Sequence, residues 1–161
     1  MQIEEIISLI KSTYPEAILA EELTAKQPWI QIATEQLLAV TEFLLKDEHL
    51  YFDFLHCISG VDLGAKEGKM ELVYHLSSLI HEHQLVLKVK IDRATPEPVP
   101  SVSSIWRAAN WHEREAYDLL GITFSDHPDL RRILLPEDWE GHPLRKDYEE
   151  AETYHGIKIK Y

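Results

Sequence analysis

The feature that most constrains the fold is an alternation of apolar and polar residues near the middle of the chain, over residues 84–91, which only Val86 breaks. Apolar residues fall at every second position: Leu85, Leu87, Val89 and Ile91. Successive side chains of a strand point to opposite faces, so this pattern predicts a strand with one buried face and one face in water. Two more β-rich runs, 50–61 and 70–79, precede it with short connections. Three strands joined in this way predict an antiparallel sheet.

The residues before the sheet predict two helices and two short strands. The first helix carries isoleucines at the spacing of one helical face: Ile3, Ile6, Ile7 and Ile10. It is expected to end at Tyr14, because the residue before a proline is disfavoured in a helix. Short strands are predicted at 17–20 and 29–32, and Thr34 is placed to cap a second helix that reaches Leu44. The order α-β-β-α-β-β-β predicts a two-layer α+β domain with a mostly antiparallel or mixed sheet.

The pattern changes beyond residue 92, where prolines recur at alternate positions: Pro96, Pro98 and Pro100. Proline cannot donate to a β ladder, so we expect an extended linker there. Ser101 is placed to cap a short helix. Asn110 and Glu113 have the spacing of a capping box, and Gly121 supplies the left-handed residue that ends the helix they begin.

The last part of the chain is interrupted too often for a long helix or strand, at Pro128, Pro136, Gly141 and Pro143. We therefore expect an α+β domain over residues 1–125 and an extended tail over residues 126–161. The tail interleaves arginine, tryptophan and tyrosine, which are enriched in protein–protein interfaces. A tail of this composition is expected to become ordered by wrapping a partner.

Composition excludes several functions. The 161 residues include 28 acidic and 16 basic side chains, a net charge of −12 that argues against nucleic-acid binding. The one cysteine, Cys57, excludes an internal disulfide and a cysteine-ligated cluster of the chain's own, and we expect it to be buried. The acidic start lacks a signal-peptide pattern and no apolar run approaches about 20 residues, so we expect a soluble intracellular chain.

A metal site is the main alternative from another class. His81 and His83 flank Glu82, and His75 lies nearby, so alternate positions of a strand could bring imidazoles together. A polar turn is the favoured interpretation, because these residues separate two apolar strand runs. A small stand-alone metal-dependent hydrolase that uses these histidines stays open as an alternative, as does a free-standing monomeric binding domain with a disordered tail.

A long motif of charged residues follows. On the predicted helix 111–120, Arg114 and Asp118 are four residues apart and are expected to face each other, with Glu115 beside them. In order, the motif is Glu113-Arg114-Glu115, two residues, Asp118-Leu119-Leu120, six residues, His127, three residues, and Arg131-Arg132-Ile133-Leu134. It resembles the signature of the 30-kDa subunit family of respiratory complex I, which is also known as the C subunit of NADH-quinone oxidoreductase. Residues 135–148 resemble the continuation of the same family.

The resemblance implies a non-catalytic subunit in the peripheral, quinone-reducing arm of a proton-translocating NADH:quinone oxidoreductase. Such a subunit binds the large 49-kDa-type subunit and other subunits of that arm, and lies peripherally on the cytoplasmic side of the cell inner membrane. It carries no flavin, cluster or catalytic residue, because NADH, FMN, the iron–sulfur clusters and the quinone are bound by other subunits. Because the chain ends at Tyr161, we expect no fusion with the large subunit.

The resemblance also marks the residues of the family signature and partner interface: Glu113, Arg114, Glu115, Asp118, His127, Arg131, Arg132, Trp139, Arg145, Lys146 and Tyr148. Those up to Arg132 would hold the signature segment and its junction with the partner. Arg145, Lys146 and Tyr148 would lie along the partner surface. A related membrane-bound hydrogenase, or a ferredoxin- or F420-dependent dehydrogenase, uses a similar subunit and is the alternative within this class.

Overall fold

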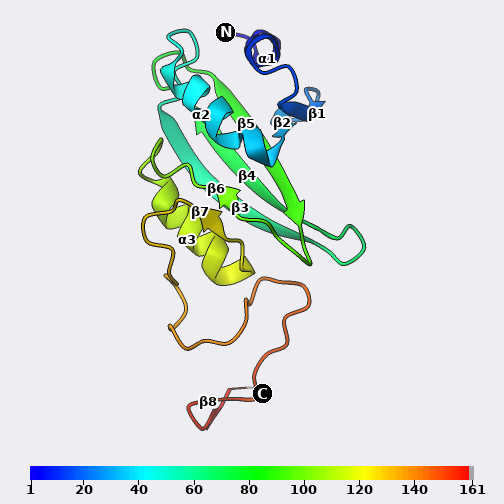
Figure 1. Cartoon of the computed structure of the whole chain (residues 1–161), viewed down its shortest axis with the longest axis vertical. Coiled ribbons are helices and arrows are strands. Elements are labelled where there is room, and N and C mark those ends of the chain that lie inside the picture. The colour runs from blue at the N-terminus through cyan, green and yellow to red at the C-terminus, as the bar shows by residue number, and fades with distance from the viewer. Residues whose placement is uncertain (160–161) are drawn as a thin grey trace.

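The computed structural model describes residues 1–159, and its helices and strands follow the predicted order (Figure 1). Their bounds are α1 Ile3–Thr13, β1 Ile18–Glu22, β2 Trp29–Ile32, a 3-10 turn Thr34–Gln36, α2 Leu37–Lys46, β3 Phe54–Gly64, β4 Lys69–Ser77, β5 Gln84–Asp92, β6 Val99–Pro100, α3 Ala109–Leu120, β7 Phe124–Ser125, β8 Thr153–Tyr154 and β9 Ile157–Lys158. The predicted α+β fold is confirmed. No helix within residues 1–159 is both long enough and apolar enough to cross a bilayer.

The main sheet has the strand order β1-β2-β5-β4-β3, in which β2 and β5 are parallel and the other neighbours antiparallel. Because successive residues alternate between faces, Leu72 and Val89, which are paired in the register, lie on the buried face. The apolar residues of α1 and α2 belong to the same core, and α2 lies across the sheet (Figure 1). The alternate residues of β5 face away from that core, and Lys88 pairs there with Glu71. The predicted division into a buried and a wet face is confirmed.

The predicted starts of two elements, the first long strand and the second helix, are wrong. The first long strand begins at Phe54 instead of residue 50, because Tyr51 has a left-handed backbone with φ of 36° that breaks the extended run. Leu50 and Phe52 are nevertheless buried in the core, which explains their apolar character. Thr34 begins a 3-10 turn, and α2 starts only at Leu37.

The proline-rich linker is partly a strand, which the sequence did not predict. Val99 and Pro100 form β6, which pairs in parallel with β7. The ladder avoids the missing proline donor, because Val99 donates its N–H to the Thr123 carbonyl and Ser101 donates its N–H to the Ser125 carbonyl. The predicted short helix after Ser101 is absent, since the next residues form turns.

Helix α3 packs beside β3 at the edge of the sheet (Figure 1). Gly60 permits this packing, because a Cβ at that position would collide with Leu120. The helix starts at Ala109, and the predicted capping box does not form, because the Glu113 carboxylate bonds elsewhere. Gly121 ends the helix with φ of 75°, as predicted.

Candidate functional site

Helix α3 buries three ionisable side chains within six residues. Glu113 and Asp118 are completely inaccessible to solvent, and Arg114 is 8% exposed. Charged side chains are rarely buried unless they are paired or hydrogen-bonded. The partners of these three groups therefore define what α3 holds in place.

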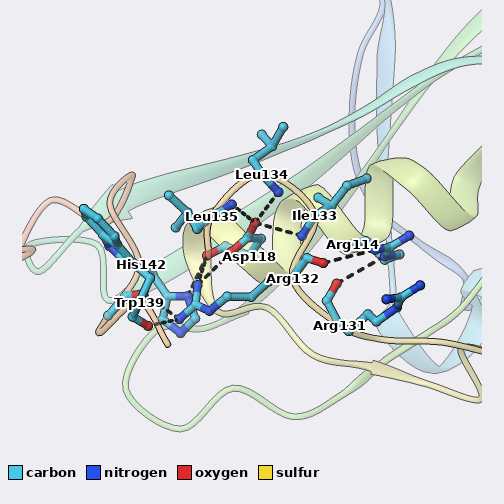
Figure 2. A network of polar contacts seen from close by, with 10 residues as sticks. Arg114, Asp118, Arg131, Arg132, Ile133, Leu134, Leu135, Trp139 and His142 are labelled. Atoms are coloured by element: carbon cyan, nitrogen blue, oxygen red, sulfur yellow. Dashed lines mark hydrogen bonds and ion pairs between the residues drawn. The ribbon is translucent and has the colours of Figure 1, made fainter. Parts of the chain in front are cut away.

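The carboxylate of Asp118 binds the segment of the chain that follows β7 (Figure 2). Its Oδ1 accepts a hydrogen bond of 2.7 Å from Arg132, and its Oδ2 accepts the backbone N–H groups of three successive residues. These are Ile133 at 3.0 Å, Leu134 at 2.7 Å and Leu135 at 2.9 Å. Burial alone would raise the pKa of Asp118, but the three N–H donors and the guanidinium outweigh burial and hold this pKa below its usual value. Asp118 is therefore a buried carboxylate that stays ionised.

Arg132 extends the same contact along the tail. Besides the carboxylate, its guanidinium donates to the backbone carbonyls of Asp118, Trp139 and Gly141, at 2.8 to 3.0 Å. His142 Nδ1 also lies 2.9 Å from the Asp118 carbonyl oxygen. Arg132 thus joins the last turn of α3 to residues 139–141, as Figure 2 shows for Asp118 and Trp139.

Arg114 does not pair with Asp118, contrary to the prediction from their spacing. Its guanidinium donates to the carbonyls of Arg131 at 3.2 Å and Arg132 at 3.0 Å (Figure 2). It also lies over the Trp111 ring, 5.4 Å from the ring centroid. The backbone carbonyls are better placed partners, because the tail passes directly over this face of α3. Arg114 and Asp118 therefore grip the same tail segment at neighbouring residues.

Glu113 lies in a different environment, although it is just as buried. Its carboxylate accepts the Ser101 hydroxyl at 2.6 Å and the Val102 N–H at 2.8 Å. Burial raises the pKa of Glu113 to about 7, and these two hydrogen bonds oppose the rise only in part. The buried hydroxyl of Tyr74 has no hydrogen-bond partner in the described structure. The pKa of Tyr74 is raised by its own burial and by the charge of Glu113.

His127 joins the start of the tail to the start of α3. Its Nδ1 accepts the Asp129 N–H at 3.1 Å, so in the neutral ring Nε2 carries the proton and donates to the Asn110 carbonyl at 3.2 Å. Nε2 lies 3.8 Å from the Glu113 carboxylate. His127 therefore ties the start of the tail to α3 through its hydrogen bond to the Asn110 carbonyl.

A second ionised carboxylate, Asp62 at the end of β3, fastens the far part of the tail. Its carboxylate accepts two hydrogen bonds from Arg93 at 2.8 and 3.0 Å, and the backbone N–H groups of Gly64 and Lys146 at 2.8 Å each. The Arg93 guanidinium is the main cause that holds the pKa of Asp62 far below its usual range. Arg93 also pairs with Asp147 at 2.8 Å. Asp62 and Arg93 were not among the predicted residues, because Asp62-Leu63-Gly64 looks like an ordinary turn.

The remaining predicted residues act mainly through the backbone or are exposed. Arg131 and Trp139 contribute carbonyls, and Lys146 contributes its N–H. Arg145 donates to the Arg93 carbonyl at 3.3 Å. Tyr148 packs its ring over Gly141. Glu115 is exposed, and no hydrogen bond or ion pair involves its carboxylate within residues 1–159.

In this structure the tail lies against the domain and is hydrogen-bonded to it. Residues 127–147 are bonded to the domain at Asn110, Asp118 and Asp62. After that, β8 and β9 form a hairpin, and Tyr154 of this hairpin donates to Asp138 at 2.8 Å. Buried carboxylates and arginines take the place of a regular backbone ladder here, and the expectation that the tail wraps a partner stays a prediction.

The histidines of the alternative metal site do not converge. His75 lies with its Nδ1 3.5 Å from the Cys57 sulfur, whereas His81 and His83 bond the carbonyls of Glu48 and Leu50. The His81–His83 segment is a turn, as predicted, although His83 is buried. Within residues 1–159, no three His, Cys, Asp or Glu side chains are arranged to hold a metal ion. Cys57 is half-buried, so its predicted full burial is wrong.

Comparison with known families identifies the chain. The model of the family described as respiratory-chain NADH dehydrogenase, 30 Kd subunit, matches residues 30–154. The chain belongs to this family. The match extends from β2 through the residues that bind Asp118 and Asp62, and it confirms the resemblance seen in the motif.

Named relatives and one solved structure agree. A relative from Chlorobium phaeobacteroides, named as the C subunit of NADH-quinone oxidoreductase, is 43% identical over 95% of this chain and 92% of its own length. A relative of the same name from Chloroherpeton thalassium is 52% identical over 76% of this chain, but over only 50% of its own length. A chain of the membrane-bound sulfane sulfur reductase, an archaeal respiratory membrane complex, superposes with a TM-score of 0.74 and 25% identity, covering 91% of this chain and 85% of its own.

Proposed function

We propose that this member of the family is a non-catalytic assembly subunit in the peripheral, quinone-reducing arm of a proton-translocating NADH:quinone oxidoreductase, and that it binds the large 49-kDa-type subunit. The observation that carries the proposal is the tail docked on α3. The buried carboxylates hold an irregular surface segment in one conformation. Loops positioned in this way on a rigid scaffold often carry binding residues.

The exposed side chains of this surface support protein binding. Trp111 on α3 is 61% exposed, Leu134 beside the Asp118 site is 62% exposed, and Leu144 near the Asp62 site is 58% exposed. Tryptophan is a typical anchor at the centre of an interface, and exposed apolar surface is typical of protein interaction sites. Because hydrogen bonds already order the backbone around them, binding requires less loss of conformational entropy than the folding of a free tail would.

The cofactors are proposed to lie in other subunits. An iron–sulfur cluster commonly takes about four cysteine ligands, whereas the sequence has one cysteine. We therefore place the iron–sulfur clusters in neighbouring subunits. From the family, we propose that NADH, FMN and quinone also bind there, and that this chain lies on the cytoplasmic side of the inner membrane through its partners. Its contribution is to hold those subunits in a fixed relative position.

The superposition on the sulfane sulfur reductase chain favours a second candidate, an equivalent subunit of a complex with another electron donor, such as a hydrogenase or a ferredoxin- or F420-dependent dehydrogenase. The two candidates predict different companions. Purification of the intact complex through this subunit would give NADH-oxidising subunits and NADH:quinone activity in the first case. It would give neither in the second.

The binding proposal is tested in the full-length chain. Deleting the whole tail is not a clean test, because it would leave Asp118 buried without Arg132 and the N–H groups of residues 133–135. We expect Leu134→Asp to lower recovery of the large subunit with the tagged chain from native membranes about tenfold, equivalent to roughly 1.4 kcal/mol. Leu19→Asp, at a residue 60% exposed on β1, is the matched control and should leave recovery unchanged. Unchanged recovery with the Leu134 variant, in a chain that still folds, would contradict this interface.

A further inference from the structure

The two edges of the main sheet are built very differently. The edge strand β1 has five residues, a register shift between Ile18 and Ala20, and two glutamates, one of which pairs with Lys11 of α1. Short length, irregular register and charge are the usual means by which proteins prevent unwanted pairing at a sheet edge. The β1 edge is therefore protected.

The edge strand β3 is less protected over its middle, although its register with β4 shifts between Leu55 and Cys57 and between Asp62 and Gly64, and α3 packs beside it. It has eleven residues, and no Asp, Glu, Lys, Arg or Pro occurs from Phe54 to Val61. Its register with β4 is unbroken from Cys57 to Asp62. In an antiparallel ladder every second residue points its backbone N–H and C=O away from the neighbouring strand. Within residues 1–159, none of the backbone groups of 57–61 has a hydrogen-bond partner outside the sheet.

A groove runs beside this open edge. It has a volume of about 300 Å³ and lies between residues 57–60 of β3 and the side of α3. The α3 wall is apolar at Ala116 and Leu119 and polar at its rim, where Glu115 has no bonded partner in the described chain. Leu144 of the docked tail lines the same groove. An unpaired strand edge next to a helix wall is the arrangement used by domains that bind an extended peptide as an added strand.

The geometry points to the outer edge of β3 as the acceptor for one extended segment of the large partner subunit, which adds as a sixth strand of the sheet. The segment directs apolar side chains toward Ala116, Leu119 and Leu144, and a lysine or arginine toward Glu115. A basic residue fits because the rim carboxylate is unpaired within residues 1–159 and the whole chain carries a net charge of −12. Leu144 makes this edge continuous with the docked tail.

This inference rests on the proposed function, but one experiment distinguishes a failure of the proposed function from a failure of the added strand. Amide hydrogen exchange is followed in the isolated chain and in the purified complex that contains it. We expect residues 57–62 of β3 to exchange at least about tenfold more slowly in the complex, while residues 18–22 of the β1 edge change little. If the chain does not enter the complex, the proposed function fails. If it does, and the β3 amides stay as in the isolated chain, only the added strand is wrong.

Two further results would also overturn the added strand. Equal slowing at both sheet edges would show general stabilisation instead of local pairing. Slowing at β3 in the isolated chain that grows with concentration would show that a second copy of the chain is the occupant.

A charged substitution gives an independent measurement. Ser59→Lys places a charge on an exposed position of the open edge, as naturally protected edges do. We expect it to lower recovery of the large subunit about tenfold without changing the thermal unfolding midpoint. Leu19→Lys on the β1 edge is the matched control and should recover the large subunit normally. Normal recovery with Ser59→Lys would count against strand addition.

Discussion

Glu113 and Asp118 lie five residues apart on one helix and are equally inaccessible to solvent, yet their pKa values shift in opposite directions. The helix dipole would favour the charge of Glu113, near the N-terminus of α3, and disfavour that of Asp118 near the C-terminus. The pKa values shift the other way, up for Glu113 and down for Asp118. The dipole contributes up to about 1 kcal/mol, whereas each hydrogen bond to a charged group contributes about 1.5–3 kcal/mol. Local donors therefore decide the charge state.

The difference lies in what the tail brings to each site. Asp118 receives a guanidinium and three backbone N–H groups from residues 132–135. Glu113 receives one hydroxyl and one N–H, and its neighbour His127 donates to a carbonyl instead. The ionised carboxylate of Asp118 thus orders residues 132–135. The carboxyl group of Glu113, whose pKa is about 7, instead joins α3 to Ser101 and Val102.

Asp118→Asn should have the largest effect. The amide removes the charge opposite Arg132, and whichever way it is turned, its NH₂ group faces N–H donors. Because breaking a buried charge pair leaves the other charge unpaired, we expect a loss of about 3–5 kcal/mol in the free energy of unfolding at pH 7. Urea denaturation measures it. Asp129→Asn, which removes an exposed partner of Arg131, is the control and should leave the unfolding midpoint unchanged. A loss no greater than that of the control would show that the network does not hold the tail.

Glu113→Gln should alter how stability depends on pH. The folded chain binds the Glu113 proton more tightly than the unfolded chain, with a pKa of about 7 against 4.5. Its favourable effect is therefore complete below about pH 4.5 and is lost as the pH rises through 7, a change of roughly 3 kcal/mol. Glutamine cannot ionise, so the variant should lose less stability than the wild type between pH 5 and 8. Urea midpoints at the two pH values provide the comparison.

Asp118 gives the opposite sign and serves as the internal reference. Its pKa is lowered on folding, so its contribution is present above the usual aspartate pKa of 3.8 and is lost as the pH falls through the lower folded value. Between pH 5 and 8, Asp118→Asn should therefore keep the wild-type slope. Identical slopes for Glu113→Gln and the wild type would mean that Glu113 is ionised in the folded chain throughout this range.

The sequence predicts what neighbouring residues determine and misses what distant ones decide. The alternation in β5 and the left-handed Gly121 are local, and both predictions hold. The capping box at Asn110 and Glu113 has correct local spacing, but the carboxylate finds better donors at Ser101 and Val102. A local pattern cannot weigh that competition.

The contacts of the tail are missed for the same reason. Asp62 bonds the N–H of Lys146, 84 residues away, and a backbone donor leaves no trace in the identity of the residue that carries it. Most residues that the motif marked take part in the contacts that hold the tail, and their role at a partner interface stays a prediction. It gave no indication that Arg114 bonds carbonyls of the tail instead of Asp118.

Asp62→Asn tests whether the rule for Asp118 holds at a second carboxylate. Asp62 also combines one arginine with backbone N–H donors, but Arg93 keeps Asp147 as another partner when the charge is removed. We therefore expect a smaller loss of about 2 kcal/mol, together with faster amide exchange at residues 145–148. Lys146→Ala is the control, because Lys146 contributes only its N–H to Asp62. A comparable loss in the control would assign the contact to the lysine side chain.

The smallest effect expected is a coupling between Arg114 and Asp118, which bond the same tail segment without bonding each other. Loss of either side chain frees residues 131–135 in part, so the second loss removes less. In a double-mutant cycle with Arg114→Ala and Asp118→Ala, we expect the combined loss to fall short of the sum by about 0.5–1 kcal/mol. The matched cycle of Arg114→Ala with Asp62→Ala should be additive, because Asp62 holds a different part of the tail. Additive losses in both cycles would mean that the two ends of α3 hold the tail independently, so that the charge of Asp118 alone orders residues 133–135.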